Sequence, residues 1–114
     1  MNICHVVPGL HPQAGGPSRT VVQLTDVIGS DSDCLVTLIT QAKIGEPQIL
    51  STNANVSRQV GLWSFKSSAL LGLPGRQNLV TTLKHSEPEL VHIHGIWHLL
   101  GHWAAAEAHR RKVP

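Results

Sequence analysis

A glycine pair early in the chain could hold a phosphate group. Gly15 and Gly16 directly precede Pro17, which suits the first turn of a helix that Gly16 or Ser18 could cap. Paired glycines let backbone amides approach an anion with no Cβ in the way, and a helix N-terminus adds partial positive charge. The segment has neither a Gly-x-Gly-x-x-Gly fingerprint nor a Gly-Lys-Ser/Thr ending, which argues against dinucleotide-binding and P-loop motifs. An ordinary loop that needs a positive φ is the alternative.

A histidine at the end of a later apolar run could contact a bound ligand. His94 follows the run 91–93 and precedes Gly95. We expect the rings of His92 and His94 to lie on opposite faces of a strand, with His92 packed structurally against a helix and His94 at the rim. A strand-end histidine alone would be assigned a structural role, but next to the glycine loop we predict that His94 and Gly95 border a ligand site.

Two more residues could line this site. His11 lies in the loop that holds the glycine pair, and Trp97 follows the turn at 94–95. Trp97 either stacks against a sugar or base, or anchors the next helix to the core. We assign Trp63 and Trp103 to the core.

Several histidines close together in the sequence raise the question of a metal site. His98 and His102 have the i, i+4 spacing that can hold zinc on a helix, but no glutamate between them could act as a general base. The segment with His92 and His94 also lacks a nearby acidic ligand, and the position of His5 gives little information. We therefore predict no metal and no cofactor, and keep a metal-dependent hydrolase as an alternative.

The elements that would position these residues alternate along the chain. Apolar runs predict strands at 2–7, 34–40, 59–63 and 89–93, helical patterns predict helices at 17–29, 78–85 and 98–112, and 64–75 reads as an irregular loop with an apolar turn. This alternation predicts an α/β fold, a Rossmann-like parallel sheet with helices on both faces.

The order of these elements predicts that the two segments meet. In a parallel sheet, the loops that leave the strand C-termini share one edge, and ligands bind where the strand order reverses. We place this reversal between the strands at 2–7 and 89–93. The Gly15-Gly16 loop and His94 should then border one crevice.

Size and composition narrow the class of protein. The chain has 114 residues, of which 41% are hydrophobic, which suffices for one domain. A net charge of +2 and a longest basic run at 110–112, where a helix would end, argue against nucleic-acid binding. We expect Cys4 and Cys34 to be buried free thiols in a reducing compartment. No signal peptide or membrane-length run is visible, so we expect a cytoplasmic protein.

Three segments together resemble the N-terminal domain of GT-B glycosyltransferases, and more narrowly the retaining group known as family 4. They are 1–10, 14–19 and 88–97, and 41–78 contributes almost nothing to the likeness. The resemblance implies a two-domain enzyme that moves a sugar from a nucleotide-sugar donor to a saccharide or lipid-linked acceptor, with retention and no required metal. It further implies polysaccharide biosynthesis in the cytoplasm, at the inner face of the membrane, with peripheral membrane association of the full-length protein.

The resemblance also implies roles for individual residues. The N-terminal domain mainly holds the acceptor, its glycine loop (Gly15, Gly16) approaches the donor diphosphate, and His94 hydrogen-bonds the transferring sugar or the acceptor. Amides at the helix start would stabilise charge on the departing diphosphate. The predicted catalytic residue is thus His94, and the predicted substrate-binding residues are His11, Gly15, Gly16, Pro17, Ser18, Gly95 and Trp97.

The family's C-terminal nucleotide-sugar domain has no counterpart in residues 1–114. We therefore expect a partial N-terminal domain that is inactive alone. The alternative function is a non-catalytic Rossmann-like module that binds a phosphorylated ligand.

Overall fold

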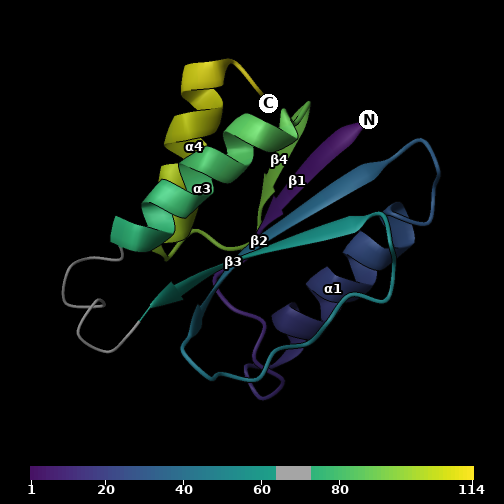
Figure 1. Ribbon diagram of the computed structural model, residues 1–114, viewed down its shortest axis with the longest axis vertical. Coiled ribbons are helices and arrows are strands. Elements are labelled where there is room, and N and C mark those ends of the chain that lie inside the picture. The colour runs from purple at the N-terminus through teal and green to yellow at the C-terminus, as the bar shows by residue number, and fades with distance from the viewer. Residues whose placement is uncertain (64–72) are drawn as a thin grey trace.

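The computed structural model describes residues 1–63 and 73–114 (Figure 1). Its elements are β1 (Asn2–Val6), α1 (Gly16–Ile28), β2 (Leu35–Lys43), β3 (Val56–Trp63), α3 (Leu73–Ser86), β4 (Leu90–Ile93) and α4 (Leu99–Arg111). The strands form one four-stranded sheet in the order β3-β2-β1-β4, and every neighbouring pair is parallel. The predicted α/β fold with a Rossmann-like parallel sheet is confirmed.

Most predicted element positions agree with the structure to within a few residues. β3 begins three residues earlier than predicted, and α3 begins at Leu73, inside the segment expected to be a loop. The rest of that expected loop, 64–72, lies outside the described residues. The positions of β1, β2 and β4 agree because these strands are mainly apolar runs bounded by proline, glycine or polar turns.

Helices cover both faces of the sheet because its strands are apolar on both sides. Figure 1 shows α3 and α4 on one face and α1 on the other. The first face packs around Cys4, Val6, Ile39, Leu79, Leu83, Leu100 and Ala104, and the second around Val7, Leu10, Val21, Val22 and Leu38. Trp103 packs against the first cluster, as predicted. The predicted core position of the Trp63 side chain lies outside the described residues.

The strand order reverses at β1. The chain passes from β1 through α1 to β2 on one side, and β4 pairs with the other side of β1. Ligands of open α/β sheets bind at the carboxyl ends of the strands at such a reversal. The two chain termini lie at the opposite, amino edge, where the Val91 amide donates to the Pro114 carbonyl at 2.9 Å (Figure 1).

The two cysteines have different surroundings, and both are free. Cys4 is fully buried, and burial raises the pKa of its thiol to about 12, so the thiol stays protonated. Cys34 is only half-buried and precedes β2, so the expectation of burial within a strand is wrong for this residue. In the described part of the chain, no helix combines the length and the apolar character required to cross a membrane.

Candidate functional site

The loop after β1 enters α1 without a side-chain cap. Gly15 is the N-cap residue, with a φ of 96° that suits glycine, and Pro17 stands in the first turn. The prediction that Gly16 or Ser18 caps the helix is wrong. Ser18 is buried, and its hydroxyl donates to the Gly9 carbonyl at 3.1 Å. The first amides of α1 therefore have no side-chain acceptor and are left for water or a ligand.

The glycine loop and the end of β4 border one cleft of about 930 Å³ at the carboxyl edge of the sheet. The predicted site residues in its wall are Gly16, Pro17, Ser18, His94 and Gly95. The two segments thus meet as their order in the sequence predicts. A Cβ added to Gly16 would meet no atom within 4 Å, so open space lies beside this backbone. We call this hollow the carboxyl-edge cleft.

Three predicted site residues lie outside the wall of the carboxyl-edge cleft: His11, Gly15 and Trp97. Gly15 adjoins the cleft through Gly16. His11 is half-buried in the loop, and its Nδ1 accepts from the Gln13 amide at 3.0 Å. Trp97 is 92% exposed, so the expectation that it anchors α4 to the core is wrong.

Three histidines gather where β1 and β4 pair. His5 of β1 stands opposite His92 of β4 in the parallel register, and His94 follows two residues later. The ring centres of His92 and His94 are 4.2 Å apart, and each lies 5.2 Å from the ring centre of His5. His5 Nδ1 lies 2.9 Å from His94 Nε2. We call these residues the histidine trio.

The expectation that His92 and His94 occupy opposite faces of the strand is wrong. Side chains two residues apart in a strand point to the same face, so both rings lie on the side that faces away from α3 and α4. His92 is consequently exposed and is not packed against a helix. His5 was missed from the sequence, although pairing the first strand with the strand at 89–93 would have placed it beside His92.

The histidine trio disfavours positive charge. Burial of His5, which is 1% exposed, lowers its pKa to about 4, and repulsion from His94 and His92 adds to the shift. Burial also lowers the pKa of His94, with His92 as a second cause. A neutral imidazole carries one N–H and one lone pair, so in the contact between His5 Nδ1 and His94 Nε2 one ring donates its N–H and the other accepts it. His5 Nε2 is buried without a hydrogen-bond partner among the described residues.

His98 and His102 do not form the metal pair considered from their spacing. His98 is the N-cap of α4, where its Nδ1 accepts from the Gly101 amide at 2.9 Å. Its Nε2 lies 3.2 Å from the His94 carbonyl oxygen, to which it can donate. Both ring nitrogens of His98 are therefore engaged, and His102 is exposed on α4.

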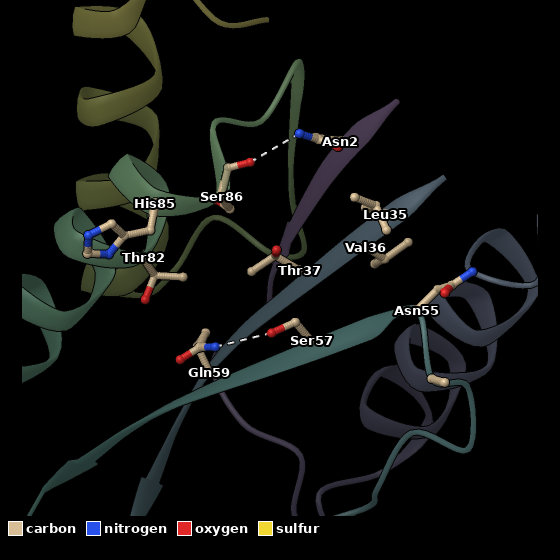
Figure 2. A pocket seen from close by; sticks show the side chains of 11 residues that line it. Asn2, Leu35, Val36, Thr37, Asn55, Ser57, Gln59, Thr82, His85 and Ser86 are labelled. Atoms are coloured by element: carbon tan, nitrogen blue, oxygen red, sulfur yellow. Dashed lines mark hydrogen bonds between the residues drawn. The ribbon is translucent and has the colours of Figure 1, made fainter. Parts of the chain in front are cut away.

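A second hollow of about 520 Å³ lies at the opposite edge, between α3 and strands β2 and β3 (Figure 2). Polar side chains in its wall bond to their neighbours. Asn2 Nδ2 donates to the Ser86 carbonyl at 3.4 Å, and Gln59 Nε2 donates to Ser57 Oγ at 3.2 Å. This amino-edge hollow contains none of the residues that the sequence marks for chemistry.

Comparisons of the chain with protein-family models, with curated proteins and with solved structures find no match. The class of protein is therefore defined by the fold and the carboxyl-edge cleft, without a relative. The chain is a Rossmann-like α/β protein with a candidate ligand site at the carboxyl edge of its parallel sheet.

Proposed function

We propose that this chain supplies the acceptor-side part of a retaining GT-B glycosyltransferase. The observation that carries the proposal is the carboxyl-edge cleft, in which the start of α1 and His94 face one space. This arrangement agrees with what the resemblance of the sequence implies. A second domain, outside residues 1–114, would bind the nucleotide sugar. The reaction would move a sugar to a saccharide or lipid-linked acceptor at the cytoplasmic face of a membrane, in polysaccharide biosynthesis, with no metal taking part in the transfer.

In this proposal, the amides at the start of α1 bind the donor diphosphate. Gly16 presents its backbone without a Cβ, and no side chain caps these amides. The helix N-terminus adds partial positive charge close to the anion. As the bond to the sugar breaks, charge grows on the departing diphosphate, and donors already in place stabilise it without reorganisation.

His94 would hydrogen-bond the transferring sugar or the acceptor. Its lowered pKa keeps the ring neutral at pH 7. Because His94 Nε2 is paired with His5 Nδ1, the other ring nitrogen, Nδ1, is left to accept a hydrogen bond from a hydroxyl or to donate one. A histidinium could only donate. The contact with His5 Nδ1 fixes the orientation of the ring at the wall of the cleft.

Binding of pyrophosphate and UDP to the purified chain tests this function. We expect changes in the amide NMR signals of Gly16 and Ser18 at the start of α1. Gly16→Ala adds one methyl group where no atom lies within 4 Å, so the fold should persist. The methyl group obstructs the anion, and we expect affinity to fall by about tenfold or more. Ala105→Val, at an exposed position of α4, is the matched control and should bind like the wild type.

Two outcomes would contradict the proposal. One is a set of pyrophosphate-induced signal changes far from α1 and His94. The other is equal affinity of the wild type and Gly16→Ala.

The second candidate function is a non-catalytic module that binds a phosphorylated ligand. The uncapped amides of α1 favour it, because they could bind phosphate without a second domain. Affinity separates the two functions. A complete module should bind a phosphorylated ligand in the micromolar range alone, whereas half of an interdomain cleft should bind only weakly.

A further inference from the structure

The histidine trio has the composition and spacing of a transition-metal site. Among residues 1–63 and 73–114, His5, His92 and His94 form the one group of three potential metal ligands. One nitrogen from each lies within 4.8 Å of the others. We propose that the trio binds one divalent transition-metal ion, with Zn²⁺ as the reference ion, and leaves a fourth coordination position to water.

The distances are close to those of a bound ion. Zinc–nitrogen bonds of about 2.0–2.1 Å place tetrahedral ligand nitrogens about 3.3 Å apart. His5 Nδ1 and His94 Nε2 are 2.9 Å apart. The widest nitrogen–nitrogen distance of the trio is at most 4.8 Å, so it has to shorten by at most about 1.5 Å. His92 is exposed, so its ring can make this movement by rotating about its side-chain bonds.

The chemistry of the three side chains also suits a transition metal. Imidazole suits zinc, copper and nickel, and three protein ligands with one open position are typical of catalytic zinc sites. The paired backbones of β1 and β4 hold the ligands in register before any ion arrives.

This proposal departs from the sequence-based prediction of no metal. That prediction rejected the pair His98 and His102 for lack of a glutamate, and the segment with His92 and His94 for lack of an acidic ligand. It drew nothing from the position of His5. The proposal does not rest on sugar transfer. A bound ion would take His94 Nε2, the nitrogen that is paired with His5, and would leave His94 Nδ1 for the proposed hydroxyl contact.

Titration of the chain without an affinity tag, after treatment with EDTA and dialysis, tests the site. Co²⁺ should bind one ion per chain and give the visible absorption of a tetrahedral complex, which Zn²⁺ then abolishes. Zn²⁺ at a hundredfold excess over its Kd should raise Tm by about 10 °C. EDTA should reverse this rise.

Variants distinguish the trio from general histidine binding. His92→Ala and His94→Ala should each weaken Co²⁺ binding by more than about tenfold and remove the Zn²⁺-dependent rise in Tm. His92 is exposed, so His92→Ala should fold even if variants of the buried His5 do not. His102→Ala, at an exposed position of α4, is the matched control and should bind like the wild type.

The proposal is overturned if the wild type shows no saturable binding of one ion per chain. It is also overturned if His92→Ala and His94→Ala bind as the wild type does, or if His102→Ala weakens binding equally. Pyrophosphate binding is measured separately and does not require the ion, so the two proposals can fail independently.

Discussion

The two edges of the sheet differ in how their polar groups are satisfied. At the amino edge, the C-terminal end of α4 carries a charged cluster in which Glu107 accepts from Arg110 and Arg111, each at 2.6 Å. Arg111 also donates to the Leu83 carbonyl of α3 at 3.5 Å, which ties the two helices together. The neighbouring Asn2 side chain is bonded to the Ser86 carbonyl. These contacts join elements of the fold to one another.

At the carboxyl edge, by contrast, the first amides of α1 border the cleft and have no side-chain cap. His5, which contacts His94 of the cleft wall, has its Nε2 buried with no partner in the described part of the chain. Both edges carry a sizeable hollow, so the presence of a hollow does not distinguish them. The uncapped start of α1 distinguishes them, because it offers backbone N–H donors to a ligand. Buried side-chain atoms without a partner among the described residues occur at both edges, as His5 Nε2 and Ser86 Oγ show.

The largest effect is expected where α4 packs against the end of β4, beside the cleft. A Cβ added to Gly101 would lie 2.9 Å from His98 Cε1 and 3.1 Å from Ile93 Cγ2. Gly101→Val should therefore lower the free energy of unfolding by about 2–3 kcal/mol through overpacking. Urea unfolding followed by circular dichroism measures the loss.

Ala105→Val is the control, because it measures what valine costs in a helix without any overpacking. Ala105 is exposed on the same helix, and its replacement should cost only about 0.5 kcal/mol. If Gly101→Val and Ala105→Val were equally stable, the close packing of α4 against β4 would be wrong.

A smaller effect, with a defined pH dependence, is expected at the amino edge. The hydrogen bond from Arg110, followed by that from Arg111, outweighs burial and lowers the pKa of Glu107 from 4.5 to about 2. A carboxyl group whose pKa is lower in the folded state stabilises the fold above its unfolded pKa. This contribution is therefore complete above pH 4.5 and is lost as the pH falls toward about 2.

Glu107→Gln should lower stability at pH 6 by about 1 kcal/mol, a small value because Arg110 is largely exposed and solvent screens the pair. Stability of the variant should also depend less steeply on pH than that of the wild type below pH 4.5. Urea unfolding at several pH values measures both effects, and high salt should reduce the difference. Parallel pH profiles of wild type and variant would show that the pair does not stabilise the fold.

The amino acid sequence was sufficient for the fold because β1, β2 and β4 are mainly apolar runs with a turn signal beside them. β3 carries three polar residues at 57–59, and its start was predicted three residues too late. The same local patterns gave wrong predictions where a particular hydrogen bond decided the outcome. Ser18 looks like a helix cap, but its hydroxyl donates to the Gly9 carbonyl. Cys34 looks like a strand residue, but its amide donates to the Asp31 carbonyl at 3.0 Å in the preceding turn, and β2 begins one residue later.

The candidate site was predictable only in part. The meeting of the glycine loop with His94 follows from strand order, which local patterns imply. The histidine trio needs the register between β1 and β4, which joins His5 to residues 87 and 89 positions away. The amino-edge hollow depends on how α3 packs over β2 and β3, and no local pattern encodes that packing.

The smallest effect on stability is expected at the amino-edge hollow, where one buried polar group is also unsatisfied. Ser86 Oγ is buried there without a hydrogen-bond partner among the described residues. Ser86→Ala removes this unsatisfied group and leaves the carbonyl that Asn2 contacts, so stability should change by less than about 0.5 kcal/mol, or rise slightly. Pyrophosphate affinity should not change, because the cleft that is proposed to bind it lies at the other edge. Ser86→Ala could instead weaken pyrophosphate binding as strongly as Gly16→Ala does. That result would place the pyrophosphate site in the amino-edge hollow and contradict the assignment of the carboxyl-edge cleft.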